Sequence, residues 1–305
     1  MSIDRSRIAS PAFRSKIMSA DDAAALVPHG ANVGMSGFTG SGHPKAVPTA
    51  LARRIEQAHA RGAQLIVLPE LCNSGYVFES REEAFALAEP FDGGATIEAW
   101  ATLATRLNVT LVAGYAERAG DVLYNAAAVI GPQRVLGNYR KLHLWGDENL
   151  FFEPGDLGVP VFDTPFGRIA CAICYDIWFP EVFRLASGGG ADLLCVPTNW
   201  VPMPEQPAHL PVMANLLAMS GAHSNGLCVA AADRVGNERG QPFLGCSVIV
   251  DASGWPVAGP ASATDEEILM AELNLADARR NRQLNTFNHV LRDRRPTVYR
   301  PITQS

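Results

Sequence analysis

Short apolar runs rich in Val, Ile and Leu, each bounded by Gly, Pro or Asp, alternate along this chain with segments of helix length. Most of the runs lack a strict apolar–polar alternation, which is typical of strands covered on both faces. The alternation of predicted strands with segments of helix length predicts a layered α/β architecture. The predicted strands are Ala31–Phe38, Gln64–Pro69, Val109–Tyr115, Val122–Ile130, Arg168–Ile173, Ala191–Val196, Leu227–Asp233, Gly245–Asp251 and Ile268–Leu273.

The segments between these runs supply the helices. Neighbouring runs around Val109–Ile130 and Leu227–Asp251 predict paired strands, and hence a partly antiparallel sheet. No low-complexity linker or repeat of fixed period divides the chain, so we expect one compact domain. The predicted helices are Lys45–Arg61, Thr96–Arg106, Glu181–Ser187, His209–Asn225 and Leu275–Leu284.

Charge and hydropathy exclude several classes of partner. The 305 residues include 25 Lys and Arg against 31 Asp and Glu, a net charge of −6, with no basic block. That balance argues against binding nucleic acid or an anionic membrane surface. No apolar stretch approaches the roughly 20 residues that span a bilayer, and the N-terminus lacks the apolar core of a signal peptide. We expect a cytoplasmic protein.

Cysteine usage fits the same compartment. Five of the six cysteines lie in or beside apolar runs, which predicts buried free thiols and no disulfide framework. Cys171 and Cys174 form a single C-x-x-C unit without the histidine partners of a zinc site, so we expect no metal.

Cys174 is the candidate nucleophile, because it follows the predicted strand Arg168–Ile173 and precedes a helix opened by Pro180. A side chain at a strand-to-helix turn projects from the sheet edge. A nearby helix N-terminus can stabilise a thiolate there and lower its pKa. The alternative is one more buried thiol, which is what we expect of Cys171 in the middle of the same strand.

Two further charged residues follow or lie within apolar stretches. Glu70 ends the buried run Leu65–Pro69, which places it at the carboxyl edge where α/β proteins locate their chemistry. Lys141 lies inside the amphipathic stretch YRKLHL. The alternatives are a surface cap for the glutamate and a solvated charge for the lysine.

Three motifs around these residues resemble the signatures of the nitrilase superfamily of carbon–nitrogen hydrolases: LPEL-xxx-GY around Glu70, YRKLHL around Lys141 and CxxCYDxxFPE around Cys174. Each motif alone is weak, but three in the right order and spacing are specific. The resemblance runs from about Arg54 to the C-terminus. It implies a four-layer α-β-β-α sandwich in a single domain, an amidase-like activity and no cofactor.

The resemblance also implies roles for these residues. Cys174 would be the nucleophile, Glu70 the general base and acid, and Lys141 a fixed positive charge beside the thiolate. Lys141 and the backbone N–H of Tyr175 would form the oxyanion hole.

The family has a second glutamate between the lysine and the cysteine. The pattern E–xxx–F–x–PG falls on Glu148, with Glu153 as the alternative.

The residues around the nucleophile favour amides over nitriles. True nitrilases of the family usually carry Cys-Trp-Glu, whereas this chain has Cys-Tyr-Asp at positions 174–176. Trp178 stands where omega-amidase branches often carry arginine, so a carboxylate clamp is absent at that position. We therefore expect a small neutral amide, with nitriles and N-carbamoyl compounds as alternatives. The pocket candidates are Tyr76, Trp178, Asn199 and Trp200, with Phe78 as a weaker one.

The N-terminal region departs from the family. Residues 7–54 resemble the opening of acetyl-CoA hydrolases and CoA transferases, but the rest of that family is not present, so we do not expect a CoA-dependent activity. The strand Ala31–Phe38 and the helix Lys45–Arg61 are predicted to replace the first strand and helix of the sandwich, as residues 29–62 of a domain spanning 29–305. Residues 1–28 would be an extension.

Two expectations concern assembly and activity. Family members are usually homodimers or larger homo-oligomers, and here the helices Glu181–Ser187 and His209–Asn225 would form the interface, with Asn285–Tyr299 as an arm. The alternative to an enzyme is an inactive scaffold or binding protein that keeps the fold.

Overall fold

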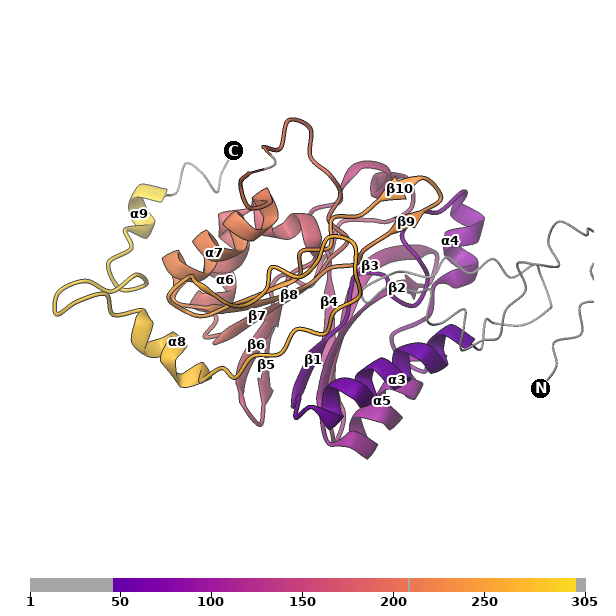
Figure 1. Cartoon of the computed structure of the whole chain (residues 1–305), viewed down its shortest axis with the longest axis horizontal. Coiled ribbons are helices and arrows are strands. Elements are labelled where there is room, and N and C mark those ends of the chain that lie inside the picture. The colour runs from indigo at the N-terminus through magenta and orange to yellow at the C-terminus, as the bar shows by residue number, and fades with distance from the viewer. Residues whose placement is uncertain (1–45, 208, 300–305) are drawn as a thin grey trace, which may run out of the picture.

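The computed structural model describes residues 46–207 and 209–299. The predicted strand Ala31–Phe38 and the predicted extension 1–28 lie outside these residues. The described part contains two open sheets and a short hairpin (Figure 1).

The first sheet has the strand order β1-β2-β3-β4, in which β1 runs parallel to β2 and the later pairs are antiparallel. The second sheet has the order β12-β11-β8-β7-β6-β5, with a parallel centre of β6, β7 and β8. The strands are β1 (Leu65–Val67), β2 (Thr110–Ala119), β3 (Val122–Ile130), β4 (Val135–Arg140), β5 (Val161–Thr164), β6 (Gly167–Cys171), β7 (Leu193–Pro197), β8 (Cys228–Ala232), β11 (Val248–Val250) and β12 (Pro256–Ala258), and β9 (Asn237–Glu238) pairs with β10 (Gln241–Pro242) in the hairpin.

The first sheet buries both faces, and its side chains divide by strand periodicity. Val112 and Val129 point toward the second sheet and join its core, whereas Leu111 and Ile130 pack on the opposite face. Helices α3 (Ala46–Ala60) and α5 (Ala95–Leu107) cover that opposite face. This division produces the continuous apolar runs seen in the sequence, because every position of a doubly covered strand is buried.

The second sheet is covered on its outer face by α6 (Pro180–Gly188) and α7 (Met213–Asn225). The two helices approach closely at Gly221, where an added Cβ would lie 2.4 Å from the Phe183 ring. The layers therefore run helix, sheet, sheet, helix, which is the predicted four-layer α-β-β-α sandwich.

Some predicted elements differ from the structure. Strands β4 and β5 and helix α4 (Arg81–Leu87) were not predicted, and Ile268–Leu273, predicted as a strand, belongs to no sheet of the described residues. Helix α7 begins at Met213, later than predicted, and the Gln206 side chain accepts the Met213 N–H (3.1 Å). Near the C-terminus lie α8 (Leu275–Asn281) and α9 (Pro296–Tyr299). None of the helices in the described ranges has the length and apolar character needed to cross a membrane.

Candidate active site

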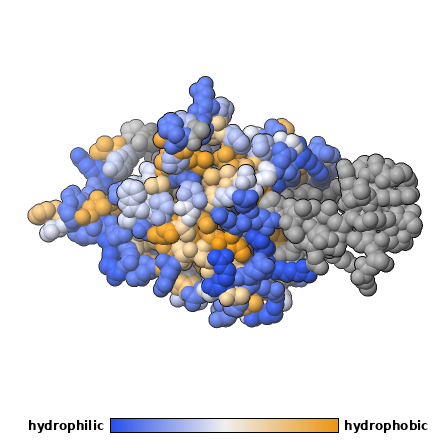
Figure 2. Space-filling view, in the orientation of Figure 1, coloured by the Kyte–Doolittle hydropathy of each residue, from blue (hydrophilic) through white to orange (hydrophobic). Residues whose placement is uncertain are grey.

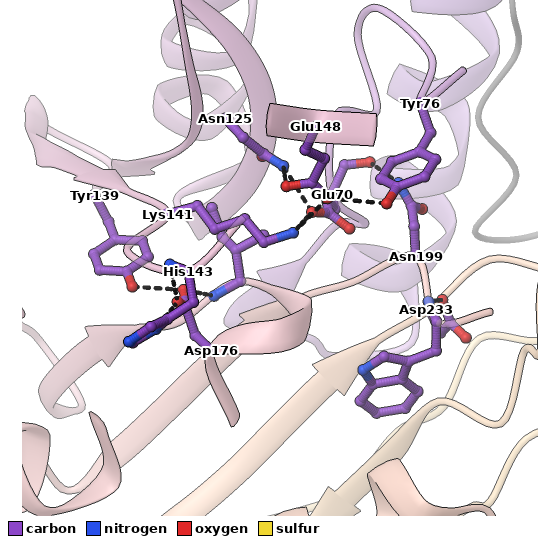
Figure 3. Close-up of polar contacts among 12 residues, drawn as sticks. Glu70, Tyr76, Asn125, Tyr139, Lys141, His143, Glu148, Asp176, Asn199 and Asp233 are labelled. Atoms are coloured by element: carbon purple, nitrogen blue, oxygen red, sulfur yellow. Dashed lines mark hydrogen bonds and ion pairs between the residues drawn. The ribbon is translucent and has the colours of Figure 1, made fainter. Parts of the chain in front are cut away.

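Glu70 lies just beyond the carboxyl end of β1 and is fully buried. Its Oε1 accepts hydrogen bonds from Asn125 Nδ2 (2.7 Å) and Lys141 Nζ (2.6 Å), whereas Oε2 has no hydrogen-bond partner among the residues that the structure describes (Figure 3). Gly114 of β2 makes this position possible, because a Cβ there would lie 2.5 Å from Glu70 Cα. One carboxylate oxygen is thus held in place and the other is free to exchange a proton.

Lys141 follows β4, and its side chain is completely buried between two carboxylates. Its Nζ donates to Glu70 Oε1 and to Glu148 Oε1, both at 2.6 Å. The backbone N–H of Lys141 continues the β4 pairing by bonding Asn125 O at 2.8 Å. Strand β3 therefore fixes the backbone of Lys141. Through the Asn125 side chain it also holds Glu70, one of the two carboxylates that the lysine contacts.

Glu148 lies in the short 3₁₀ turn η1 (Gly146–Leu150) and is buried. Besides Lys141, its Oε1 accepts the Tyr76 hydroxyl at 2.9 Å. Glu153, the other candidate for the second glutamate, has an exposed side chain. Of the two, only Glu148 lies beside the lysine.

Cys174 begins the 3₁₀ turn η2 (Cys174–Trp178) after β6 and has a φ of +45°. A non-glycine residue in the left-handed region costs about 1–2 kcal/mol and is common at functional sites. The first hydrogen bond of the turn runs from Asp176 N to Ile173 O, so the N–H of Tyr175 precedes it and is not used within the turn.

Asp176 clamps this turn to the strand that leads to the lysine. Its Oδ2 accepts the Tyr139 hydroxyl (2.6 Å) and Ile173 N (2.9 Å), and its Oδ1 accepts His143 N (3.0 Å) (Figure 3). Tyr139 belongs to β4 and His143 follows it, so one buried carboxylate sets the position of the Cys174 turn relative to Lys141.

Burial and neighbouring charges shift the pKa values of these groups. Burial raises the pKa of Glu70 to about 7, against the opposing charge of Lys141. Burial alone would lower the pKa of Lys141, but the carboxylates of Glu148 and Glu70 outweigh it and raise that pKa, so the ammonium stays charged.

The expected lowering of the pKa of the Cys174 thiol is wrong. Burial, followed by the charge of Glu70, raises the pKa of Cys174 well above its usual range, and the opposing effects of Lys141 and the Thr198 hydroxyl are smaller. The resting site therefore pairs a neutral thiol with a carboxylate whose pKa lies near neutrality.

The cysteine opens onto a small apolar cavity of about 20 Å³. Trp178, Asn199 and Trp200 line it, as predicted for the pocket. Three further residues line this cavity and were not predicted from the sequence: Trp145, Val201 and Met203.

A larger hollow of about 500 Å³ adjoins this cavity, since Trp145 and Val201 line both. The predicted pocket residues Tyr76 and Phe78 lie in this second hollow, together with Glu148.

Two other residues at the site, Asn125 and Asp176, were not predicted although the sequence carries a signal for each. Asn125 is the one strongly polar side chain in the apolar strand β3, and a buried polar group in such a run needs a specific partner. Asp176 lies within the CYD motif itself.

Comparison with known proteins places this geometry in a family. The model of the carbon–nitrogen hydrolase family matches residues 44–283. The chain belongs to the carbon–nitrogen hydrolases of the nitrilase superfamily. It is 43% identical over 245 residues to a nitrilase of Pyrococcus abyssi, covering 80% of this chain and 89% of the relative. It is 34% identical to an N-carbamoylputrescine amidase of Arabidopsis thaliana, covering 83% and 88%.

Solved structures agree with the family and with its fold. A carbon–nitrogen hydrolase from Helicobacter pylori G27 superimposes with a TM-score of 0.72 at 29% identity, over 92% of this chain and 97% of that one. An amidase from Nesterenkonia sp. AN1 gives 0.69 at 25% identity, over 85% and 94%, and that structure has acrylamide added to its active-site cysteine. These findings confirm the predicted fold and the assignment to C–N hydrolysing enzymes.

The N-terminal region also matches a second family model. The acetyl-CoA hydrolase/transferase N-terminal domain aligns with residues 1–78, so it overlaps the start of the carbon–nitrogen hydrolase match. This finding confirms the resemblance noted for residues 7–54.

Proposed function

We propose that this carbon–nitrogen hydrolase converts a small amide to the acid and ammonia through an acyl-enzyme on Cys174. The observation that carries the proposal is the buried Lys141 ammonium held between Glu70 and Glu148, with the second oxygen of Glu70 unpartnered. Proton transfer needs a free oxygen of suitable pKa, and oxyanion stabilisation needs a fixed positive charge.

In the acylation step, Glu70 Oε2 takes the proton from Cys174 as the sulfur attacks the amide carbon and the C–S bond forms. The negative charge that develops on the carbonyl oxygen is stabilised by Lys141 Nζ and the backbone N–H of Tyr175. Glu70 then returns its proton to the leaving nitrogen. The C–N bond breaks, ammonia leaves and a thioester remains.

Deacylation uses the same groups in reverse. Glu70 removes a proton from water, the hydroxide attacks the thioester carbon and the C–S bond breaks. The proton on Glu70 passes to the departing thiolate, which restores the neutral thiol. A carboxyl with a pKa of about 7 suits both directions, because it gives and takes a proton with little energetic bias at neutral pH.

Glu148, Tyr76 and Asn125 act as positioning residues. Glu148 orients the ammonium, Tyr76 holds Glu148, and Asn125 holds Oε1 of Glu70. None of these groups needs to exchange a proton in the cycle above.

The cavity beside the thiol supports a small, neutral acyl group. It is narrow and lined mostly by tryptophan and aliphatic side chains, and none of the described residues that line it is charged. The amidase from Nesterenkonia sp. AN1 has been solved with butyramide, an amide of this size. Nitrile hydrolysis is the second candidate, since the relative from Pyrococcus abyssi is a nitrilase.

Turnover measured on matched substrates tests the proposal. Butyramide, butyronitrile and N-carbamoylpropylamine share a short aliphatic chain and differ in the bond cleaved. We expect the highest kcat/KM for the amide, and no turnover of any of the three by Cys174→Ala. A higher kcat/KM for the nitrile would favour the second candidate, and turnover by the variant at several per cent of the unmodified enzyme would contradict the mechanism.

We also propose a homodimer or larger homo-oligomer. Leu185 of α6 and Met213 of α7 are large exposed apolar side chains on the outer helices. Val298, in the C-terminal segment, is also a large exposed apolar side chain. Light scattering of the purified chain would measure the mass. Leu185→Glu is expected to lower it to that of one chain, and a single chain of 32.7 kDa in the unmodified protein would contradict the proposal.

A further inference from the structure

Tyr76 lies in residues 75–80, a stretch between Glu70 and α4 that belongs to no helix or strand. Its hydroxyl donates to Glu148 Oε1 at 2.9 Å, and the same oxygen accepts Lys141 Nζ (Figure 3). Backbone groups outside helices and strands need other partners. The position of this hydroxyl therefore depends on what holds the Tyr76 backbone.

Glu238, in the short strand β9, holds this backbone from 162 residues away in the sequence. Both of its carboxylate oxygens accept the Tyr76 N–H, at 3.1 and 3.2 Å, and Oε1 also accepts the Val77 N–H at 3.1 Å. Glu238 is only 6% exposed, so these bonds form away from water. Hydrogen bonds to a charged acceptor are stronger than those between neutral groups. One buried side chain thus fixes two successive N–H groups of the irregular stretch.

Arg234 and Phe243 hold Glu238 and the ring of Tyr76. Arg234 is buried and pairs through Nη1 with Glu238 Oε2. Its guanidinium lies over the Phe243 ring, 3.9 Å from the centroid, which is a cation–π contact. The Tyr76 ring meets the same Phe243 ring in a T-shaped contact, with the centroids 5.8 Å apart. Tyr76 is therefore held at its backbone and at its ring, and both contacts direct its hydroxyl toward Glu148.

The hairpin that carries Glu238 also holds the carbonyl group of Val77. Arg239, the next residue, donates from Nη1 to Val77 O (2.9 Å) and pairs with Glu83 of α4 (2.7 Å). Figure 2 shows mostly hydrophilic residues over α4 and the hairpin, and Glu238 lies beneath that surface. A buried carboxylate and an exposed guanidinium from neighbouring residues thus bind both backbone groups of Val77.

Glu238 reaches the active site through other side chains. Among the described residues that line the cavity beside Cys174 and the larger hollow, Glu238 does not occur. The contacts run from Glu238 to Tyr76, from Tyr76 to Glu148 and from Glu148 to Lys141. A residue that lines neither space is not placed to exchange a proton with a substrate, so an effect on the rate would be an effect on position.

We propose that Glu238 is a positioning residue of the active site, which sets the Tyr76 hydroxyl against Glu148 and thereby holds the Lys141 ammonium where negative charge develops. The inference rests on the proposed function, because Lys141 stabilises an oxyanion only in that mechanism. The alternative is that Glu238 stabilises the hairpin alone. The two differ in one respect, since positioning requires the Tyr76 hydroxyl and support of the hairpin does not.

A double-mutant cycle with the Tyr76 hydroxyl tests the proposal. Glu238→Gln removes the charge that accepts the two N–H groups, and small misplacements of reacting groups are costly, so we expect kcat to fall by about 10–100-fold and KM to change less. In Tyr76→Phe, which lacks the hydroxyl, the same substitution should change kcat by no more than about twofold, because both changes remove one chain of contacts. Equal losses in the two backgrounds would overturn the proposal.

Asp192→Asn is the matched control for the loss of a buried carboxylate. Asp192 is 1% exposed, accepts Arg168 N (3.1 Å) and pairs with Arg279 (2.8 Å). It precedes β7, which runs parallel to β6, so it lies at the opposite edge of the second sheet from Cys174. We expect the melting temperature to fall in both carboxylate variants and kcat to fall only in Glu238→Gln. Similar losses of kcat would indicate general destabilisation and overturn the proposal.

Alkylation of Cys174 by iodoacetamide separates this proposal from the proposed function, because it requires no C–N cleavage. A positive charge beside the sulfur favours the thiolate, so Glu238→Gln should slow alkylation by about tenfold, and should not slow it further in Tyr76→Phe. If the unmodified protein turned over no amide, nitrile or carbamoyl compound, the proposed function would fail and alkylation would still decide the role of Glu238. Unchanged alkylation in Glu238→Gln would overturn that role.

A second substitution covers the case in which Glu238→Gln does not fold. Glu238→Asp keeps a negative charge beside Arg234 but shortens the side chain by one methylene group, which draws the carboxylate away from the Tyr76 N–H. We expect the same loss of kcat and of alkylation rate, again only while the Tyr76 hydroxyl is present. Loss of either quantity without dependence on that hydroxyl would overturn the proposal.

Discussion

The two sheets contribute to the active site in different ways. The first sheet provides Glu70, Asn125 and Lys141, which are held by short hydrogen bonds between charged and polar side chains. The second sheet provides Cys174 and most of the apolar cavity, and the cysteine has a left-handed backbone conformation at the start of η2. Under the proposed function, proton transfer and charge stabilisation belong to one layer, and the nucleophile and the substrate cavity belong to the other.

The active site therefore exists only because contacts between the two sheets bring these residues together. Asp176 joins the cysteine turn to Tyr139 of β4. Asn199, after β7, donates from Nδ2 to Glu70 O at 3.0 Å. Each sheet alone holds half of the chemistry, so variants in one layer, in the other and in the contacts between them have distinguishable effects.

The largest effect is expected for the nucleophile of the second sheet. Cys174→Ala removes the atom that forms the acyl-enzyme, so kcat should fall by about 10⁴-fold or more. Cys171→Ala is the control, since that thiol is buried in the preceding strand, and it should lower the melting temperature but retain most of kcat. Residual turnover of several per cent by Cys174→Ala would contradict its role.

Loss of the base in the first sheet should cost somewhat less. Glu70→Gln keeps the shape of the side chain but cannot take a proton, and general acid–base catalysis contributes about 10²–10⁴-fold. We expect kcat to fall within that range, measured with the amide. Glu153→Gln, on the exposed glutamate, should leave kcat unchanged. Equal losses in the two variants would indicate a non-specific effect of charge.

Breaking a contact between the sheets should give an intermediate loss. Asp176→Asn weakens the hydrogen bonds that set the cysteine turn against β4, and misplacement of a reacting group by about 1 Å can cost about 10²-fold in rate. We expect kcat to fall by that order, with a smaller fall for Tyr139→Phe, which removes one of the bonds. Full activity of Asp176→Asn would show that the two layers stay aligned without it.

The pH dependence of kcat/KM should distinguish the groups around Glu70. The ionised carboxylate is the active form, so activity should rise with pH through about 7, the pKa of Glu70. The Asn125 hydrogen bond stabilises the ionised form, so Asn125→Ala should raise the pKa of Glu70 and move this rise to higher pH. The negative charge of Glu148 opposes ionisation, so Glu148→Gln should move it to lower pH. Shifts in the same direction would contradict this arrangement.

The smallest effect is expected at the cavity wall of the second sheet. Trp178→Ala enlarges the space beside Cys174 and should change selectivity between short and longer aliphatic amides by about 10–100-fold, since one methylene in an apolar pocket is worth about 1–3 kcal/mol. The measurement is kcat/KM for acetamide, butyramide and hexanamide. Unchanged ratios would place the acyl chain elsewhere, with the larger hollow beside Glu148 as the next choice.

The sequence predicted more of the fold where strands are apolar throughout. Strands β2, β3, β6 and β7 were found because burial on both faces leaves continuous apolar runs. Strand β4 was missed because Gly137 and Asn138 interrupt its pattern, and both residues have low strand propensity. Strand β5 is four residues long and half-buried, so it leaves little pattern to read.

The site was predictable where a motif surrounds the residue and not where one side chain acts alone. Glu70, Lys141 and Cys174 each lie in a recognisable local pattern. Asn125 does not, because its importance comes from its contact with Glu70, 55 positions away in the sequence. No local pattern indicates such a pairing, which arises only when the sheet brings β3 and the end of β1 to opposite sides of β2.

The chemical groups that this protein has, and their order, follow from the sequence alone: a carboxylate after a buried strand, a lysine in an amphipathic stretch and a thiol at a turn. The tertiary structure decided which oxygen of Glu70 is free, that Glu148 and not Glu153 lies against the lysine, and that the resting thiol is neutral. The physical reason is that proton affinity depends on burial and on charges a few ångströms away, and those neighbours come from distant parts of the chain.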